Sequence, residues 1–362
     1  MPLDPDLVAW LRLSLTPGLS GAGVRRLLTA FGEPGRVLAA SRRELAQHVT
    51  DAVAAAIQQA NTADAVVTAG RWLEDPANCV VTLADRLYPP RLLQIPDPPL
   101  LLYVRGRAEW LSRPALAIVG SRNATAQGTA NAEAFARALS DAGLTIVSGL
   151  ALGVDTAAHR GGLAGASSSI AIFGTGVDIV YPARNRGLAH ELAGRGALVS
   201  EFALGTRALA GNFPRRNRLI SGLALGCLVV EAAADSGSLI TARLAAEQGR
   251  EVFAIPGSIH SPLAKGCHAL IKHGAKLAES ARDILEELQI PAPAPIAAAS
   301  ADVTDASARR VFDALGDDVC SRDTLALRSK LQPAELAALL TQLELEGHVA
   351  QLPGGLFQRV RR

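Results

Sequence analysis

One segment combines an aromatic ring with closely spaced guanidinium groups: GNFPRRNRLISGL, residues 211–223. Phe213 supplies the ring, and the polar residues that follow it are Arg215, Arg216, Asn217 and Arg218. The chain holds no Asp or Glu from residue 202 to residue 230. Arginines that contact phosphates beside a ring that stacks on a base are typical of proteins that bind single-stranded nucleic acids. We therefore interpret the segment as a DNA-binding loop with unpaired arginines. The alternative is a solvated basic loop with Phe213 in the core.

Two other segments carry the residues of a phosphate site. Gly120 ends an apolar run, and Ser121 and Arg122 follow it. We expect a helix N-terminus there, whose backbone N–H groups bind anions with help from the Arg122 guanidinium. The segment SGSLIT, residues 236–241, repeats the pattern at the start of another expected helix. Its expected donors are Ser236, Gly237 and Ser238. The alternative for this segment is an ordinary serine N-cap.

Asp155 and His159 lie four residues apart, on one face of an expected helix. The pair has the chemistry of a general acid and base, but no serine or cysteine nucleophile lies at a suitable spacing. We favour a structural role in which Asp155 caps the helix and His159 bonds to it. Nearby histidines and a cysteine match no metal-ligand spacing; these are His260, Cys267, His268 and His273. We therefore expect no catalytic residue, no metal and no cofactor.

Five apolar runs rich in β-branched residues alternate with helical stretches and would position these groups. They are ALAIVG (115–120), LTIVSG (144–149), SIAIFG (169–174), CLVVEA (227–232) and EVFAIPG (251–257). Continuous apolar runs suit strands that are buried on both faces, as in a parallel sheet covered by helices. We predict an α/β fold, a Rossmann-like doubly wound parallel sheet, whose strand ends bring the polar segments to one rim.

The flanking regions predict further domains. Residues 1–75 form a helical domain of the SAM or helix-hairpin-helix type, and its turn TPGLSGAG either faces DNA phosphates or simply joins two helices. Prolines exclude a long helix from residues 76–113, a bridge expected to pack on the core as an extended edge segment. The core then spans residues 114–289, a Pro/Ala linker 290–305, and a winged helix 306–362.

Composition excludes several classes of protein. With 49% hydrophobic and 19% charged residues the chain is globular, and at a net charge of +2 any nucleic-acid site must depend on local charge. Its four cysteines are scattered, which predicts neither disulfides nor zinc. No secretory signal is evident, and the uncharged stretch 161–177 is too short for a membrane span. We expect a cytoplasmic protein without membrane contact.

Several motifs, in this order, resemble those of the DNA-processing protein A (DprA/Smf) family. They are IVGSR, SGLALGVDTAAH, GTGVDIVYPARN, SEF, NFPRRNRLISGL, VVEAAADSGSLITARLAAEQGREVFAIPG and LIKHGA. The resemblance implies a Rossmann-like domain that binds single-stranded DNA and forms homodimers. It further implies that the protein protects incoming DNA and helps load the RecA recombinase during natural transformation, without enzymatic activity.

The same resemblance implies roles for individual residues. Arg122 would hold a backbone phosphate, Phe213 would stack on a base or line its pocket, and Lys265 would add a positive contact. Arg215, Asn217 and Arg218 would surround the ring. The chain departs from the family's motifs at Leu152 and in the stretch RALAG before Phe213, where basic residues are common. Their possible substitutes are Arg207 and Arg216.

The winged helix lacks basic residues where a DNA-reading helix needs them. No Lys or Arg occurs from residue 331 to residue 358, whereas Glu335, Glu344 and Glu346 lie on or near the expected recognition helix. A helix that brings only negative charge cannot approach phosphates favourably. We therefore predict that this domain contacts protein or has a supporting role.

Two rival functions follow from the same residues. The fold and a Gly-Thr turn also resemble nucleoside-monophosphate phosphoribohydrolases of the lysine-decarboxylase-like group, in which Glu231 or Glu247 would assist cleavage of an N-glycosidic bond. That family's glycine pair is missing here, and Glu247 lies further along the chain than expected. A protein-interaction scaffold that binds no nucleotide is the third, weaker reading.

Overall fold

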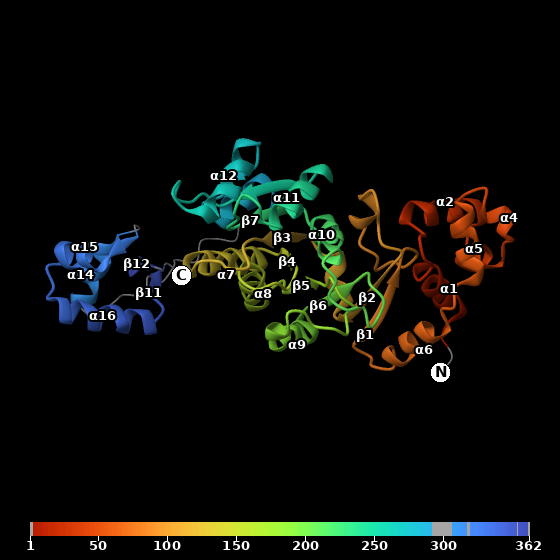
Figure 1. Cartoon of the computed structure of the whole chain (residues 1–362), viewed down its shortest axis with the longest axis horizontal. Helices are drawn as coiled ribbons and strands as arrows, with labels where there is room; N and C mark the ends of the chain where they lie inside the picture. The colour runs from red at the N-terminus through yellow and green to blue at the C-terminus, as the bar shows by residue number, and fades with distance from the viewer. Residues whose placement is uncertain (1–2, 292–305, 317–318, 353, 361–362) are drawn as a thin grey trace.

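The protein is described here from a computed structural model that covers residues 3–291, 306–316, 319–352 and 354–360. Figure 1 shows N-terminal helices at one end, a helix-covered sheet in the middle and a winged helix at the other end. From residue 292 onward the predicted linker lies outside the described residues. Within the described ranges no helix is long and apolar enough to cross a membrane.

A nine-stranded sheet forms the centre of the molecule. Its strands are β1 (Asn78–Thr82), β2 (Leu101–Gly106), β3 (Ala115–Val119), β4 (Thr145–Ser148), β5 (Ser169–Ile172), β6 (Ala197–Ser200), β7 (Gly226–Val229), β8 (Glu251–Ala254) and β9 (Lys276–Leu277). They lie in the order β1-β2-β6-β5-β4-β3-β7-β8-β9. The strands from β3 to β9 pair in parallel, whereas β2 pairs antiparallel with both β1 and β6. All five apolar runs form strands, which confirms the predicted α/β fold.

Helices cover both faces of this sheet. They are α7 (Ala126–Asp141), α8 (Val154–Ala164), α9 (Arg186–Arg195), α10 (Asn212–Leu223), α11 (Ser238–Glu247), α12 (Lys265–Lys272) and α13 (Ala281–Glu287). In β3, Ala117 and Val119 pack with residues of α10 and α11, while Leu116 and Ile118 pack with α7 and α8. Alternate residues thus enter two hydrophobic cores, which explains the continuous apolarity of the strands.

The strand order contains the reversal that the sequence predicts. From β3 the chain moves outward through β4, β5 and β6, then returns to pair β7 with the other side of β3. In open parallel sheets a crevice forms beyond the carboxyl ends of the strands at this point. The turns that follow β3 and β7 therefore border a natural binding site.

The proline-spaced bridge contributes more than an extended edge, because it adds β1 and β2 to the sheet. Between them, Tyr88 is buried, and its hydroxyl donates to the carbonyl oxygen of Pro99 at 2.7 Å. At the opposite edge β9 has only two residues, Lys276 and Leu277, and both are exposed. The sheet therefore ends in a long antiparallel margin on one side and a very short strand on the other.

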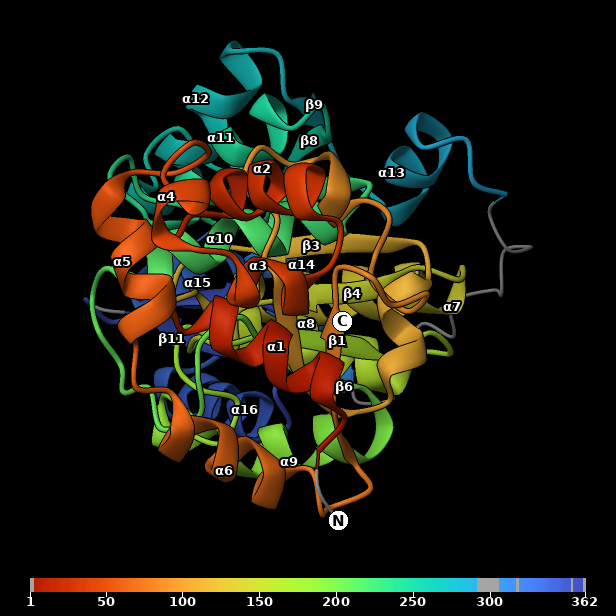
Figure 2. The ribbon, with the colours of Figure 1, turned by 90° about the vertical axis from the view of Figure 1, so that its right-hand side faces the viewer.

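Six helices precede the sheet and lie in front of it in Figure 2. They are α1 (Pro5–Ser14), α2 (Gly21–Phe31), α3 (Pro34–Ala39), α4 (Arg42–Leu45), α5 (Asp51–Gln59) and α6 (Ala63–Trp72). Leu13, Leu27 and Ile57 belong to a core of their own. Trp10 and Leu11 pack instead in a cluster with residues of β2, so α1 ties these helices to the sheet.

The C-terminal region forms three helices and a small antiparallel sheet, which confirms the predicted winged helix. Its elements are α14 (Ala306–Leu315), β10 (Cys320–Ser321), α15 (Arg322–Ser329), α16 (Pro333–Leu345), β11 (Val349–Leu352) and β12 (Leu356–Arg359). The strand order is β10-β12-β11. Val311, Leu336 and Phe357 belong to its separate core.

Candidate nucleic-acid interface

A pocket of about 780 Å³ opens at the switch point between β3 and β7. Its polar and aromatic lining includes Gly120, Ser121, Arg122, Asn123, Tyr181, Phe213, Arg216, Asn217, Ser236, Gly237 and Ser238. All the site residues predicted from the sequence line this pocket, with the exception of Arg215, Arg218 and Lys265. Loops from separate strand ends thus converge as expected, and Arg122 and Phe213 share one cavity.

Three helices begin at the pocket: α8, α10 and α11, whose first turns contribute Asp155, Phe213 and Ser238 to its lining. Their N-cap residues are Gly153, Gly211 and Gly237, and none of the three has a side-chain cap. The macrodipole of each helix places partial positive charge at its N-terminus. The pocket therefore favours anions beyond what its arginines contribute.

The turn at Gly120–Arg122 differs from the expectation, because no helix starts there. Helix α7 begins at Ala126, and Thr125 caps it by accepting from the Gly128 amide. The Ser121 amide donates to the Glu231 carbonyl oxygen at 2.7 Å, and the Ser121 carbonyl oxygen accepts from Val154 at 3.1 Å. The positive helix end beside this turn is thus that of α8.

Two glycines allow this close packing. A Cβ at Gly120 would lie 2.7 Å from a Val154 methyl carbon, and a Cβ at Gly153 would lie 2.3 Å from the Ser121 carbonyl oxygen. Arg122, in contrast, is exposed and forms no ion pair within the described part of the chain. Its guanidinium is held beside the pocket by a tight turn and remains able to pair with a phosphate.

Residues 212–223 form helix α10 and not the predicted loop, and Arg216 in this helix is buried. Pro214 lies in the first turn, where its missing N–H costs no helical hydrogen bond. The Arg216 Nη1 donates to the carbonyl oxygens of Gly149, at 2.8 Å, and Ile172. Burial lowers its pKa to about 10, Asp155 opposes this shift, and Arg122 adds to it. Arg216 therefore joins the ends of β4 and β5 beneath the pocket and does not replace a missing surface cation.

The expected bond between Asp155 and His159 is absent from the described residues, although both are structural. The Asp155 carboxylate accepts from the amides of Gly149, at 3.1 Å, and Ala151, at 3.2 Å. His159 Nε2 accepts from the Leu150 amide at 3.3 Å, so Nδ1 carries the proton and lies 2.7 Å from the Ser169 hydroxyl.

These bonds hold the turn after β4, in which Leu150 has a φ of 59°. Burial lowers the pKa of His159 to about 3 and is the main cause that raises the pKa of Asp155. The imidazole is therefore neutral at physiological pH, and its nitrogens are both engaged. This pair supports the pocket floor and is not arranged for acid–base catalysis.

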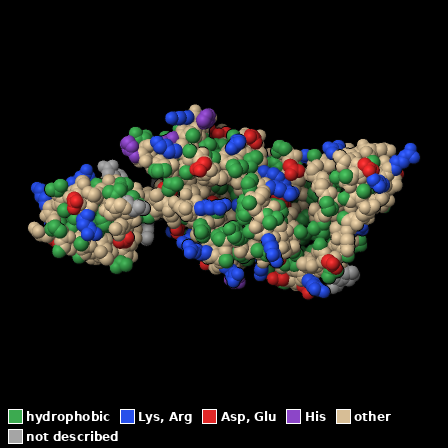
Figure 3. All heavy atoms as spheres, viewed as in Figure 1, with side chains coloured by type: hydrophobic (Ala, Val, Ile, Leu, Met, Phe, Trp, Pro, Cys, Tyr) green, Lys and Arg blue, Asp and Glu red, His purple; other side chains and the backbone are tan. Residues whose placement is uncertain are grey.

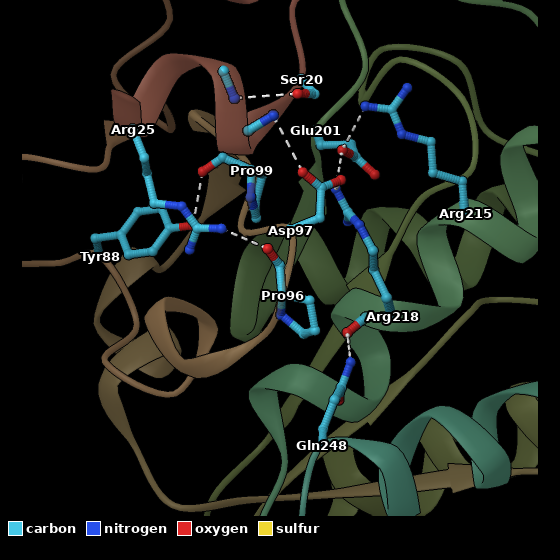
Figure 4. Close-up of polar contacts among 12 residues, drawn as sticks. Ser20, Arg25, Tyr88, Pro96, Asp97, Pro99, Glu201, Arg215, Arg218 and Gln248 are labelled. Carbon is cyan, nitrogen blue, oxygen red and sulfur yellow. Dashed lines mark hydrogen bonds and ion pairs between the residues drawn. The ribbon is translucent and has the colours of Figure 1, made fainter. Parts of the chain in front are cut away.

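Arg215 and Arg218 lie on another side of α10, where they meet acidic residues (Figure 4). The Glu201 carboxylate accepts from Arg215 at 3.1 Å and from Arg218 at 2.7 Å. Arg218 also pairs with Asp97 at 3.4 Å. The prediction of unpaired arginines is wrong for both, since Glu201 lies one residue before the acid-free stretch and Asp97 is far away in sequence.

The same contacts involve the turn between α1 and α2. Asp97 accepts from the Gly21 amide at 3.2 Å, and Arg25 donates to the Pro96 carbonyl oxygen at 2.6 Å. A Cβ at Gly21 would lie 2.5 Å from the Asp97 Oδ1. The sequence left two interpretations of this turn: contact with DNA phosphates, or a simple connection between two helices. In the structure its Gly21 amide already donates to the Asp97 carboxylate. We call this set of contacts around Asp97, Glu201 and Arg218 the junction.

Three other predicted groups lie outside the pocket. Lys265 is the first residue of α12, and its ammonium donates to the Ile259 carbonyl oxygen at 2.6 Å. The Glu231 carboxylate accepts from the Thr125 amide and hydroxyl at 2.9 and 2.6 Å, and Glu247 is exposed at the end of α11. Among the described residues Asp155 is the only acidic one that lines the pocket. Neither Glu231 nor Glu247, the two residues named for the phosphoribohydrolase interpretation, therefore lines this pocket.

Asn123 and Tyr181 are among the lining residues that sequence reasoning missed. The ring centroids of Tyr181 and Phe213 are 5.5 Å apart. The sequence places Tyr181 in the loop after the apolar run SIAIFG but does not indicate that this loop reaches Phe213. No group of three or more metal-binding side chains occurs in the described ranges.

Comparisons with known proteins show the family of this chain and agree with its fold. Residues 79–289 match the family model of DNA recombination-mediator protein A, and residues 277–355 match the DprA winged helix domain. The chain is 44% identical over 299 residues to protein Smf of Escherichia coli, covering 80% of each protein. It is 45% identical over 208 residues to DNA processing protein DprA of Streptococcus pneumoniae, covering 58% of this chain and 73% of that one.

Two solved structures are also similar. The X-ray structure of DNA processing protein A from Streptococcus pneumoniae superposes with a TM-score of 0.67 at 36% identity, covering 79% of this chain and 99% of that one. A structure of DNA processing protein A from Helicobacter pylori, solved to study its single-stranded DNA binding mode, gives 0.53 at 30% identity and covers 58% and 95%. The chain therefore belongs to the DNA recombination-mediator protein A family, with a DprA winged helix domain in its C-terminal part.

Proposed function

We propose that this recombination mediator binds single-stranded DNA in the switch-point pocket, protects it, and helps load RecA recombinase on it during natural transformation. One observation carries the proposal: Arg122, three helix N-termini and the Phe213 ring converge on one cavity. The relative from Helicobacter pylori, studied for its single-stranded DNA binding, supports it. This role places the protein in the cytoplasm.

The pocket suits an unpaired strand better than a duplex. Phe213 is half-buried inside a cavity, so a base must leave its stack to reach the ring. On the face that Figure 3 shows, Lys and Arg side chains are dispersed among Asp and Glu and do not form one broad basic surface. Binding that depends on a concave, local site is expected to select accessible bases and flexible backbone.

Within the pocket we assign separate roles. Arg122 contacts a phosphate, Phe213 stacks on a base, and Asn217 offers its amide. Further donors for phosphate or base come from the loop after β7 and from the turn after β3, and these are Ser236, Gly237, Ser238, Gly120 and Ser121. Arg215, Arg218 and Lys265 lie outside the pocket, and we propose that they contribute less. We assign no catalytic step, because Asp155, the one carboxylate among the described residues that line the pocket, accepts from two backbone amides.

We propose further that homodimers form through the Rossmann-like domain and that RecA is the partner protein. The proposed domains are a helical domain (1–75), a bridge (76–113), the DNA-binding core (114–289), a linker (290–305) and the winged helix (306–362).

In the winged helix, α16 exposes Glu335, Glu344 and Leu345, and we propose that it contacts protein. Such a surface repels phosphates and offers an apolar side chain that is 85% exposed. Removal of residues 306–362 is then expected to change the affinity for single-stranded DNA by less than about twofold. A gel-shift titration of the shortened chain measures this, and a large loss would instead give the domain a part in DNA binding.

The decisive experiment compares oligo-dT with a duplex of equal length across a salt series. About three or four neutralised phosphates predict a slope of roughly −2 to −3 for the logarithm of the binding constant against the logarithm of salt concentration. Arg122→Ala is expected to weaken binding and to reduce the slope by about 0.7. Arg282→Ala, an exposed arginine on α13, is the matched control. Equal affinity for duplex and single strand, or an unchanged Arg122→Ala, would overturn the proposal.

A further inference from the structure

We infer that Tyr181 extends the Phe213 ring into a continuous aromatic shelf, on which a second base stacks. The inference rests on the proposed function and adds to it a residue that selects for bases rather than backbone. Tyr181 follows β5 and lines the same pocket as Phe213, which comes from α10. Two elements far apart in the sequence thus supply neighbouring rings.

The exposure of Tyr181 is the first reason. The residue is 50% exposed, whereas the two other tyrosines, Tyr88 and Tyr103, are at most 3% exposed. Within the part of the chain that the structure describes, it is also the only aromatic residue besides Phe213 that lines the pocket. A large ring half in solvent beside a cavity is available to an incoming flat ligand.

The spacing of the two rings is the second reason, and it decides the mode of binding. Their centroids are 5.5 Å apart, and their planes are inclined at 42°. A base placed between two rings needs contacts of about 3.5 Å on each side, or about 7 Å in all. The gap is too small for a base, so Tyr181 and Phe213 cannot act as a clamp. A base can reach only the faces that point away from the other ring.

The Phe213 ring and the loop that carries Tyr181 are held in place by contacts within the chain. Phe213 packs so closely on Gly174 that a Cβ there would lie 2.7 Å from its Cδ1. In the loop that leads to Tyr181, the Thr175 hydroxyl donates to the Ile179 carbonyl oxygen at 2.6 Å, and the Ser200 hydroxyl donates to the Thr175 carbonyl oxygen at 2.6 Å. Because the Phe213 ring and this loop are already ordered, stacking on the shelf requires little rearrangement of the backbone.

The shelf and the serine donors of the pocket follow different strands of the sheet. Tyr181 follows β5, whereas Ser236 and Ser238 follow β7, and β4 and β3 lie between these two strands. Three strand spacings amount to about 14 Å. A strand that crosses the pocket can therefore place its backbone near the serines and Arg122 while its bases lie over the rings.

The test uses the full chain with Tyr181→Ala, Tyr181→Phe and the control Leu93→Ala, a residue that is 50% exposed away from the pocket. Each variant is titrated with an oligo-dA that contains 2-aminopurine and with an abasic strand of equal length. Thermal unfolding shows that the variants remain folded.

We expect Tyr181→Ala to lose about fivefold or more in affinity for the base-containing strand, with a smaller fluorescence change, and to match the wild type on the abasic strand. Tyr181→Phe and Leu93→Ala should resemble the wild type on both. An unchanged Tyr181→Ala, or an equal loss on the abasic strand, would overturn the shelf while wild-type binding still supports the proposed function. Failure of the wild type to bind either strand would overturn both.

Discussion

Helix α10 presents polar side chains to two regions of the molecule. Toward the pocket it places Phe213, Arg216 and Asn217, and toward the junction it places Arg215 and Arg218. Arg216 is bound by backbone carbonyls, whereas Arg215 and Arg218 share the buried carboxylate of Glu201. Helix α10 thus carries one arginine that joins strand ends and two that pair with Glu201, of which Arg218 also reaches Asp97 of the bridge. Arg122, which forms no ion pair within the described ranges, comes from another strand end.

This difference shows that positive charge in a sequence does not locate a nucleic-acid site by itself. A guanidinium can contact phosphate only where the fold leaves it unpaired and accessible. Arg218 has 12% of its side chain exposed and two acidic neighbours, so a phosphate would have to displace a carboxylate. The two sides of α10 should therefore respond differently to substitution, pH and salt.

The largest expected effect is that of Arg216→Met. The substitution removes the donor to the Gly149 and Ile172 carbonyl oxygens and leaves buried Asp155 without its neighbouring cation. We expect the free energy of unfolding to fall by about 3–5 kcal/mol, measured by urea denaturation. Arg122→Met is the control and should change stability by less than about 0.5 kcal/mol. If Arg216→Met were fully stable but no longer bound DNA, Arg216 would be a DNA contact and not a structural group.

The second largest effect is expected from low pH, which should lower the free energy of unfolding through His159 beneath the pocket. The pKa of His159 falls from 6.5 to about 3 on folding, so the stability it contributes is present above pH 6.5 and is lost as the pH falls toward 3. We expect the wild type to lose up to about 1.4 kcal/mol of unfolding free energy per pH unit in this window.

His159→Gln should start less stable and depend less on pH, which urea denaturation at several pH values measures. His190→Gln, at an exposed position of α9, should keep the wild-type slope. A His159→Gln that follows the wild-type pH profile would mean that another group titrates.

DNA affinity distinguishes the two sides directly. Phe213→Ala is expected to weaken binding of single-stranded DNA by about 1–3 kcal/mol, because a stacking surface is lost. Arg215→Ala should cost less than about 0.5 kcal/mol, since its guanidinium pairs with Glu201. Fluorescence anisotropy with a labelled oligonucleotide measures both. If Arg215→Ala is as damaging as Phe213→Ala, the bound strand extends across the junction as well.

The smallest effect is expected at the junction. Asp97→Asn removes the ion pair to Arg218 and keeps an oxygen that can accept from the Gly21 amide. Because Asp97 is 47% exposed, we expect a loss of about 0.5 kcal/mol at low salt, and almost none in 1 M NaCl, where charges are screened. Urea denaturation at both salt concentrations measures the difference. A loss that persists at high salt would assign Asp97 a packing role rather than an electrostatic one.

Much of the fold and part of the site could be predicted from local patterns. The strands were evident because residues such as those of ALAIVG are apolar without interruption, and the pocket followed from where these runs end. The short strand β6 (Ala197–Ser200) was missed, as was the extent of α10, whose Pro214 and arginines suggested a loop.

What could not be predicted depends on contacts between distant residues. Asp97 and Arg218 are 121 positions apart, and nothing local indicates that they meet. The Asp155–His159 spacing is that of a bonded pair, but the strained turn at Leu150 supplies better partners for both. The contact between Tyr181 and Phe213 likewise joins two separate elements, the loop after β5 and helix α10.

The short edge strand β9 limits how two chains could pair along this margin of the sheet. Strand β9 offers only Lys276 and Leu277 at its edge, and a short edge strand that carries a lysine is a poor template for pairing with another chain. Two molecules that met along this margin would have to join through side chains rather than by continuing the backbone ladder. This margin therefore disfavours the runaway edge-to-edge growth that leads to fibres.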